Sequence, residues 1–428
     1  MRVMKDSGVE YIGLVPSNWS ILKTIYVLDM PITDGPHTTP ELLDSGIPFI
    51  SAEAISTGKI DFNHMRGYVS EDFYRICCLK YIPRKNDIYM VKSGATTGRV
   101  AMVEIDETFT IWSPLAVFRA NENKVLSRFL FYSIQSPSYT RQVEHGWSFG
   151  TQQNIGMRVL ERLKICLPTI EEQFSIVDFL DAKCAEIDAL TTDIQTQIDT
   201  LEQYKRSAIT ETVTKGLNPN AEMKDSGIQW IGNMPAHWDV IRGKYILHYM
   251  QKPVREDDDV ITCFRDGEVT LRSNRREDGF TMSDKEIGYQ GIDIGDLVVH
   301  GMDGFAGSIG ISDSRGKASP VLNVLDTDQC KRYIMYYLRS MAYSDVFLAL
   351  ATGIRVRSCD LRWNKLAELS YPVPPLDEQN AIVKHIDSVL SKADAVIADK
   401  KAQLATLDEY KKSLIFEYVT GKKEVPVS

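Results

Sequence analysis

Hydrogen-bond donors gather beside a glycine-containing loop in the first half of this chain. The loop, residues 93–98, follows an apolar run typical of a buried strand. The donors on and beside it are Lys92, Ser93, Thr96, Thr97 and Arg99. Such side chains next to flexible backbone suit contacts with the phosphates and base edges of DNA. The sequence therefore predicts a nucleic-acid contact at this loop.

The second half repeats the arrangement with other side chains. A similar loop, residues 301–307, follows a similar apolar run. Its candidate DNA-binding residues are Arg265, Arg272, Arg275, Arg276, Arg355 and Arg357, whereas the first half offers Thr151, Gln152, Gln153 and Asn154 where the second has the last two arginines. Arginine reads guanine and the amides read adenine, so the two halves are predicted to read different sequences. For any single residue, solvated surface charge or an amide cap is an equal alternative.

Motifs of catalysis do not occur. Neither glycine loop gives the G-x-x-x-x-G-K-[ST] pattern of a nucleotide site, and no N-P-P-[FY] or D-P-P-[YW] methyltransferase tetrapeptide is found. The seven histidines and seven cysteines show no metal spacing. The carboxylate run at residues 257–259 is interpreted as a solvated turn. We therefore expect a non-catalytic chain without its own cofactor or metal.

An internal repeat frames both loops. Residues 4–23 and 223–242 share nine of twenty identical positions, and residues 167–179 match residues 373–385. The segments between these matched parts are much less alike. Each half of the chain thus consists of a short matched segment, a variable domain and a long helix. The short segment, residues 4–23 and 223–242, is called the box below.

Two long helices follow the variable domains. Each begins after a proline, Pro168 or Pro374, and runs without proline or glycine until Gly216 or Gly421 can stop it. Apolar residues recur every seven: Leu180, Ile187, Ile194, Leu201 and Ala208 in the first, and Val383, Leu390, Ile397 and Leu404 in the second. This period predicts a coiled coil in which the helices pair with one another. Packing of each helix on its own domain is the alternative.

Composition is ordinary for a globular protein, with 428 residues and a formal net charge of -9. The acidic balance argues against a simple nucleic-acid binder. Residues 171–215, however, hold ten Asp/Glu and four Lys/Arg, so much of the acidity falls on one predicted helix. No apolar run approaches a membrane span and the start lacks a signal sequence, so a cytoplasmic location without membrane contact is expected.

The boxes and helix starts resemble those of the specificity (S) subunits of Type I restriction–modification systems. The first box carries Asp6, Ser7, Gly8, Ile12, Gly13, Pro16 and Trp19, repeated as Asp225, Ser226, Gly227, Ile231, Gly232, Pro235 and Trp238. The helix starts share Pro168, Glu172, Gln173, Ile176 and Val177 with Pro374, Glu378, Gln379, Ile382 and Val383. The segment 34–40, with candidate DNA-binding residues Thr38 and Thr39, looks familial in the first half only.

The resemblance implies an α+β fold: two globular α/β target-recognition domains joined by two long helices in an antiparallel coiled coil, with an internal pseudo-twofold repeat. The expected division is 1–166 (first box and recognition domain), 167–217 (first helix), 218–372 (second box and domain) and 373–428 (second helix and tail).

The same resemblance implies function and partners. Each domain would read one half of a bipartite site in double-stranded DNA, and the helices would fix the spacing. Two methyltransferase subunits, which carry S-adenosylmethionine, and restriction subunits would join the chain. Residues of the helix frame that would dock partners are Glu172, Gln173, Leu180, Ile187, Tyr204, Glu378, Gln379, Ile386, Leu407 and Tyr410. A coiled-coil scaffold that binds only proteins is the alternative.

Overall fold

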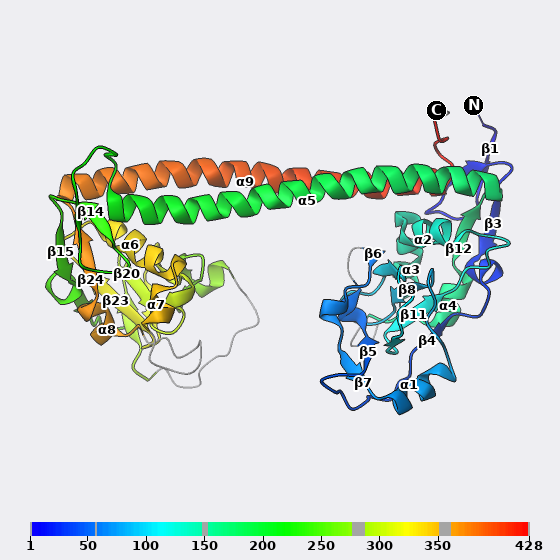
Figure 1. Ribbon diagram of the computed structural model, residues 1–428, viewed down its shortest axis with the longest axis horizontal. Coiled ribbons are helices and arrows are strands. Elements are labelled where there is room, and N and C mark those ends of the chain that lie inside the picture. The colour runs from blue at the N-terminus through cyan, green and yellow to red at the C-terminus, as the bar shows by residue number, and fades with distance from the viewer. Residues whose placement is uncertain (1, 56–57, 148–152, 276–286, 351–360, 427–428) are drawn as a thin grey trace. The chain divides into compact units, whose positions relative to one another are not determined.

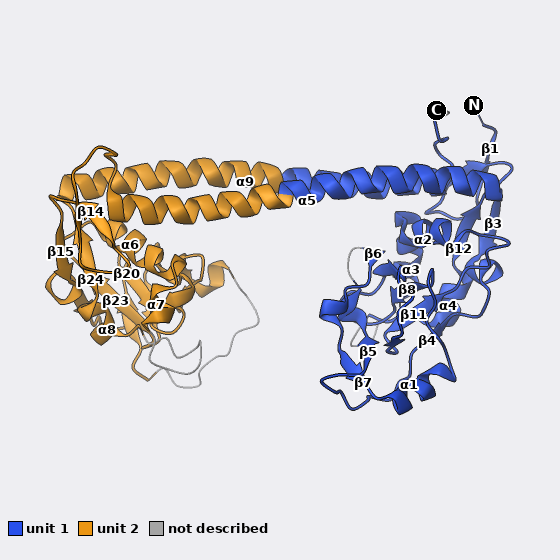
Figure 2. Ribbon diagram, in the orientation of Figure 1, with its two compact units in different colours: residues 1–194, 402–428 blue, residues 195–401 orange. Residues whose placement is uncertain are grey.

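The computed structural model of the chain describes residues 2–55, 58–147, 153–275, 287–350 and 361–426 (Figure 1). These form two compact units (Figure 2). Unit 1 comprises residues 1–194 and 402–428, and unit 2 comprises residues 195–401. Each unit therefore combines one globular domain with the first part of one long helix and the last part of the other.

Unit 1 holds the first domain, which mixes short strands and helices. Its strands are β1 (Met4–Asp6), β2 (Leu14–Pro16), β3 (Ser20–Lys23), β4 (Thr33–Asp34), β5 (Ile47–Ile50), β6 (Gly58–Lys59), β7 (Gly67–Val69), β8 (Ile88–Val91), β9 (Val100–Met102), β10 (Thr110–Ile111), β11 (Leu115–Phe118) and β12 (Lys164–Leu167). Its helices are η1 (Thr24–Val27), η2 (Ala52–Ala54), η3 (Phe62–His64), α1 (Glu71–Cys78), α2 (Ser127–Gln135), α3 (Pro137–His145) and α4 (Met157–Arg162), and α5 (Ile170–Lys215) begins here.

Unit 2 holds the second domain, built on a similar plan. Its strands are β13 (Met223–Asp225), β14 (Asn233–Pro235), β15 (Asp239–Arg242), β16 (His248–Met250), β17 (Ile261–Cys263), β18 (Val269–Leu271), β19 (Gln290–Ile292), β20 (Leu297–His300), β21 (Ile309–Ile311), β22 (Gly316–Ala318), β23 (Leu322–Asp326) and β24 (Ser370–Val373). Its helices are η4 (Gly243–Tyr245), η5 (Arg272–Asn274), η6 (Gly304–Ala306), α6 (Lys331–Tyr343), α7 (Val346–Ala349) and α8 (Trp363–Glu368), and α9 (Leu376–Val419) begins here.

The central sheets of the two domains share the order of four strands despite their divergent sequences, and the first domain adds β6 at one edge. In the first domain the order is β4-β11-β8-β9-β6, and in the second it is β16-β23-β20-β21. The apolar runs predicted as equivalent strands form β8 and β20, each antiparallel to both of its neighbours. The repeat therefore extends through the variable domains as a shared fold.

Each central sheet is buried on both faces, which explains why its strands read as continuous apolar runs. Because successive side chains of a strand point to opposite faces, Ile88 and Met90 of β8 enter the core that contacts α5, whereas Tyr89 and Val91 enter a second core. The aromatic residues of α2, and Tyr333, Tyr336 and Tyr337 of α6, are buried in the helix-side cores.

The long helices pair in an antiparallel coiled coil, as predicted. In unit 1, the Phe179 ring lies 4.5 Å from that of Tyr418, and Lys411 forms an ion pair with Asp188 at 2.6 Å. Partner numbers on α9 thus fall as those on α5 rise. In unit 2, Lys205 pairs with Asp394 at the same distance of 2.6 Å. The two ion pairs join residues that the repeat makes equivalent.

The alternative of each helix packing on its own domain is also realised, at the helix start. Gln173 is completely buried; its Oε1 accepts from the backbone N of Leu126 at 2.8 Å, and its Nε2 donates to the carbonyl of Pro168 at 3.1 Å. Gln379 repeats this with Cys330 and Pro374, both at 2.9 Å. Each amide satisfies backbone groups that burial would otherwise leave unpaired.

A second anchor follows two turns later in each helix. Asp181 accepts hydrogen bonds from Arg128 at 2.7 Å and from Tyr132 at 2.5 Å. Asp387 accepts from the equivalent residues of α6, Arg332 and Tyr336, each at 2.6 Å. The aromatic helix of each domain is therefore tied to the long helix by a buried amide and a shared carboxylate.

The matched boxes form β-hairpins that close the far ends of the helices. The β1–β2 and β13–β14 hairpins have equivalent registers, Met4 with Pro16 and Met223 with Pro235. The first hairpin packs at the end of α9, where Lys422 donates to the carbonyls of Ile12 and Leu14, each at 2.7 Å. Each box thus packs at the end of a long helix. The second box packs at the end of α5, which directly precedes it, and the first box packs at the end of α9, the last helix of the chain.

Glycine ends both helices, as predicted from the sequence. Gly216 and Gly421 have φ of +73° and +70°, in the left-handed region that residues with a Cβ atom rarely adopt. A Cβ at Gly421 would meet Pro16 at 2.5 Å and Trp19 at 3.1 Å. The box and the helix end are therefore packed too closely to accept a methyl group.

Replacing Gly421 with alanine is expected to lower the free energy of unfolding by about 3 kcal/mol, since a left-handed conformation costs about 1–2 kcal/mol and overpacking about 1–3 kcal/mol. Gly8 is the matched control because its φ is also +70° but nothing lies within 4 Å of its Cβ position. Gly8→Ala should cost about 1 kcal/mol. Urea unfolding of both variants measures the difference, and equal losses would contradict this account of the packing.

Candidate nucleic-acid interface

Segments that lie far apart in the first-domain sequence come together around the glycine-containing loop. Ser93 forms an isolated β-bridge with Asn154. The backbone N of Gly94 donates to the carbonyl of Gln153 at 3.0 Å, and Thr97 Oγ1 donates to the carbonyl of Gly94 at 2.7 Å. The loop and the amide-bearing segment that the sequence proposed separately thus form one continuous surface.

A buried carboxylate, Asp34, joins a third segment to this surface. Asp34 is fully buried, and its Oδ2 lies 3.2 Å from Lys92 Nζ and 3.3 Å from His37 Nε2, while Lys80 pairs with its other oxygen. The Lys92 side chain is only 13% exposed. Its ammonium group is therefore held by Asp34, and this contact fixes the start of the loop.

The outer rim of this surface consists of side chains that can reach a ligand. Thr38, Thr39, Arg99 and Gln153 are exposed, and Thr96 is half-buried. Among the described residues Arg99 forms no ion pair. Thr151 and Gln152, which the sequence also proposed, lie outside the described residues. The first domain therefore gathers hydroxyl, amide and guanidinium donors over a fixed carboxylate base.

The second domain places Arg265 against its own glycine-containing loop. Arg265 Nη2 lies 3.1 Å from the Asp303 carboxylate, within the loop 301–307. Arg272 lies on the neighbouring hairpin, where its Nε donates to Thr262 Oγ1 at 3.3 Å. Here too, a loop after the central strand and a distant polar segment form one surface.

Arg275 is held by acidic and aromatic neighbours. It lies 2.7 Å from the Asp266 carboxylate and 3.0 Å from that of Glu268, with its guanidinium 4.2 Å from the Phe264 ring centre. These contacts hold the guanidinium group of Arg275 in place. Arg276, Arg355 and Arg357 lie outside the described residues.

His300 shapes the backbone of the second loop. Its Nδ1 accepts from the backbone N of Met302 at 3.2 Å and of Asp303 at 2.9 Å, so the ring must be unprotonated at that atom. Burial lowers the pKa of His300 below its usual value, although nearby Asp303 opposes the shift. The loop beside Arg265 therefore depends on a neutral histidine.

The helix-frame residues divide between core and surface. Leu180, Ile187, Ile386, Gln173 and Gln379 are buried, and Leu407 is partly buried. Glu172 accepts from Trp19 Nε1 at 3.1 Å, and Glu378 lies 2.8 Å from His237 Nε2. Tyr204 and Tyr410 are each 54% exposed. These tyrosines are thus the members of the set most accessible to a partner.

Sequence reasoning missed several residues that build this site or attach its domain to the long helix. Asp34 was part of a familial segment, but its type and position gave no sign that it would be buried beneath two lysines. Asp181 and Asp387 had a usable signal, because the repeat aligns them. The interpretation of the run 257–259 as a solvated turn holds for Asp257 and Asp259, which are exposed. It is wrong for Asp258, which is buried and accepts two hydrogen bonds from Arg315, each at 3.1 Å.

No group of three or more potential metal ligands occurs among the described residues. Within the same residues, none of the helices is long and apolar enough to cross a membrane. The arrangement of the site is one of donors over fixed backbone. Donors of this kind suit contacts with polar edges and phosphates.

Fold and site together define a duplicated protein whose two domains each present a polar loop surface. Comparison with known proteins links this plan to DNA recognition. Residues 36–200 match the family model described as the Type I restriction modification DNA specificity domain. The chain is 25% identical to the type I restriction enzyme MjaX specificity subunit of Methanocaldococcus jannaschii, covering 97% of this chain and 96% of that one. It is 22% identical to the MjaVIII specificity subunit of the same organism, covering 96% and 94%.

The fold also occurs in a solved structure of a type I restriction–modification system. One chain of that structure superposes with a TM-score of 0.66 at 16% identity, over 96% of this chain and 99% of that one. The chain thus resembles Type I specificity subunits over nearly its whole length, and this similarity, together with the DNA specificity domain at residues 36–200, supports a role in DNA recognition.

Replacing Asp34 with asparagine should leave Lys92 without its partner and lower the free energy of unfolding by about 3 kcal/mol, because a partly buried charge is then uncompensated. Adding Lys92→Met removes that charge. The double variant should therefore be more stable than Asp34→Asn alone, as chemical denaturation can measure. Additive losses would show that the two residues are not coupled.

Acidification should destabilise the loop that His300 holds. The unfolded histidine titrates near pH ~6.5, whereas the folded one has a lower pKa. Its stabilising contribution is thus complete above pH ~6.5 and is lost as the pH falls toward the folded pKa.

His300→Asn is the matched control, since an amide oxygen can accept the same backbone donors without titrating. The free energy of unfolding of the parent protein should fall more steeply between about pH 7.5 and 5.5 than that of the variant. Parallel pH profiles would argue against this role for His300.

Proposed function

We propose that each domain reads one half of a bipartite, asymmetric site in double-stranded DNA, while the helix pair sets the distance between the halves. The observation that carries this proposal is that the paired long helices and their boxes hold two domains, which share one fold but differ in the side chains on their loop surfaces. Thr38, Arg99 and Gln153 line the first surface, and Arg265 and Arg275 line the second. Amide and guanidinium donors prefer different bases.

The helix pair would dock two methyltransferase subunits, which bring S-adenosylmethionine, and restriction subunits would join this core. Support comes from two equivalent exposed surfaces. Tyr204 and Val396, exposed by 54% and 43%, lie in unit 2, and their repeat counterparts Tyr410 and Leu190, exposed by 54% and 51%, lie in unit 1. A surface presented twice suits two copies of one partner.

In this proposal the chain itself is non-catalytic and binds no cofactor. It acts in the cytoplasm as the recognition component, and its net negative charge is offset by the local donor surfaces and by the partner subunits. Methylation and cleavage would then reside in those partners.

The experiment is co-expression with the methyltransferase subunit of its own system, followed by single-molecule sequencing of methylated DNA. We expect methylation at one split sequence with two unlike halves. Exchanging residues 234–372 for the corresponding domain of a relative should change one half and leave the other half and the gap unchanged. Changes in both halves would contradict the assignment of one domain to each half-site.

A scaffold that binds only proteins predicts a different result. Gel-shift measurements with and without methyltransferase subunits separate the two functions. Specific retardation of DNA carrying the methylated sequence supports recognition. Absence of a sequence-specific shift in every combination would favour the scaffold.

A further inference from the structure

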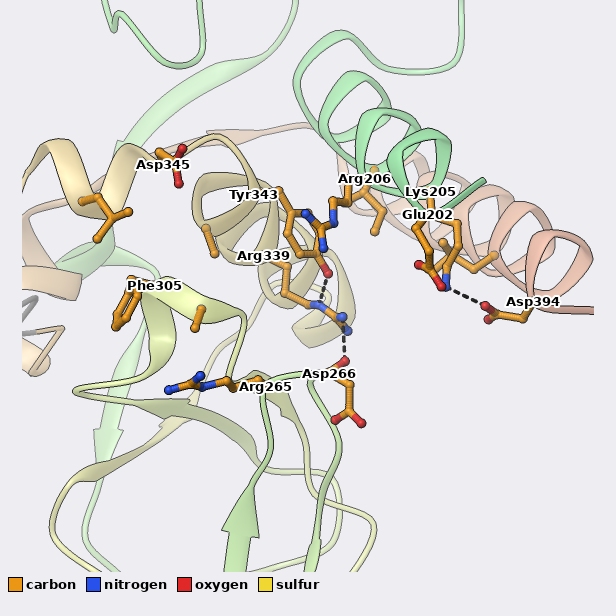
Figure 3. Close-up of a pocket in the computed structure, with 15 residues that line it drawn as sticks. Glu202, Lys205, Arg206, Arg265, Asp266, Phe305, Arg339, Tyr343, Asp345 and Asp394 are labelled. Atoms are coloured by element: carbon orange, nitrogen blue, oxygen red, sulfur yellow. Dashed lines mark hydrogen bonds and ion pairs between the residues drawn. The ribbon is translucent and has the colours of Figure 1, made fainter. Parts of the chain in front are cut away.

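A cavity of about 750 Å³ lies within unit 2, between the second domain and the last turns of α5 (Figure 3). Arg206 enters it from α5, and Arg339 and Tyr343 enter it from α6. Arg265 and Asp266, from the turn after β17, complete the opposite wall. The cavity thus joins the helix frame to the polar surface of the recognition domain.

Two guanidinium groups in this cavity flank one aromatic ring. The Arg206 guanidinium carbon lies 5.4 Å from the Tyr343 ring centre, and that of Arg339 lies 5.7 Å from it. Arg339 Nε donates to Tyr343 Oη at 2.8 Å, and its Nη2 donates to the Asp266 carbonyl at 2.7 Å. Figure 3 shows the three side chains converging. Arg339 is therefore held in place by neutral oxygens.

Neither guanidinium forms an ion pair among the described residues, although most charges around them are matched. Lys205 pairs with Asp394, as described above, and also with Glu202 at 3.1 Å. Asp266 pairs with Arg275 and Arg265 with Asp303. The remaining carboxylate, Asp345, is drawn well apart from both guanidinium groups in Figure 3. Two positive charges in a concave site thus have no counter-charge in the part of the chain that the structure describes.

The repeat shows that this feature is specific to unit 2. The position equivalent to Arg206 is Lys412, which pairs with Asp408 at 2.7 Å and Glu409 at 2.8 Å. Arg339 corresponds to Gln135. Tyr343 corresponds to Tyr139, which is buried and bonded to Thr24 at 3.2 Å. The described residues of unit 1 thus do not repeat this arrangement, so the cavity is not part of a docking surface that is presented twice to identical partners.

We propose that this cavity binds a phosphate group, with Arg206 and Arg339 as its two guanidinium donors and Tyr343 as the wall between them. Guanidinium forks match the oxygens of phosphate, and a phosphate can engage two forks at once. Two sources share this chemistry: the DNA backbone and a free nucleotide. The DNA backbone is favoured because Arg265, on the recognition surface, lines the same cavity. This assignment of the phosphate to DNA rests on the proposed function.

Fluorescence anisotropy with a mixed-sequence duplex, repeated over a range of KCl concentrations, tests the DNA source on the full chain. Each phosphate contact adds about 0.9 to the slope of log affinity against log salt. We expect Arg206→Gln to reduce that slope by about 0.9 if it removes one such contact. Lys412→Gln, the repeat-matched control whose charge is already paired, should leave the slope unchanged.

Calorimetric titration with ATP tests the free-nucleotide source. ATP binding that is lost in Arg206→Gln but kept in Lys412→Gln, with unchanged DNA slopes, assigns the phosphate to a nucleotide. Arg339→Lys, which keeps the charge and removes the fork, should weaken whichever ligand binds, and thermal melting verifies that it folds.

Equal DNA slopes and equal ATP binding in the parent, Arg206→Gln and Lys412→Gln proteins would overturn the proposal. Failure of the proposed function looks different. A parent complex without sequence-specific DNA binding but with ATP binding that depends on Arg206 would reject DNA recognition and retain the phosphate site.

Discussion

The structure depends on one buried amide at the start of each long helix. Gln173 and Gln379 have no exposed surface, and each satisfies a backbone donor of its domain and a carbonyl that precedes its helix. An apolar side chain there would leave those backbone groups unpaired at about 1–3 kcal/mol apiece. The amide therefore fixes the position of the domain along the helix, and the carboxylate of Asp181 or Asp387 fixes the rotation of the domain about the helix.

This attachment leaves the opposite side of each domain free to vary. The helix-side face of the central sheet packs against α5 or α9, whereas the other face builds a separate core that supports the loops. Changes in the second core or the loops need not disturb the attachment. A symmetric frame can thus carry unlike recognition surfaces, and the cavity around Arg206 shows that asymmetry even reaches the frame itself.

The sequence predicted the frame well because its signals are local and were present twice. Proline, an acidic first turn, an apolar heptad and a terminal glycine specify each helix without reference to the rest of the chain. The equivalence of β8 and β20 followed from similar apolar runs. The loop at residues 93–98 could be proposed as a site from the sequence, because donors and glycines cluster along the chain.

Long-range contacts could not be read in the same way. Nothing local indicates that Asp34 is buried under Lys80 and Lys92, because a carboxylate is usually exposed and only the fold brings the lysines to it. Nothing in the sequence around Arg206 distinguishes it from other charged residues on a helix surface. Its significance depends on the missing counter-charge, and that depends on which side chains α6 and the turn after β17 place nearby.

The discontinuity of unit 1 has a consequence for how the protein is made. The core of the first domain includes Leu414, Ile415, Tyr418 and Val419 from the end of α9, whereas unit 2 is one continuous segment. During synthesis, unit 2 can bury its core while the last turns of α9 are still to be added. The first domain leaves the ribosome earliest yet closes last, so its hydrophobic surface beside α5 stays open the longest. Newly made chains are thus most exposed to misassembly and to chaperones at the half that was translated first.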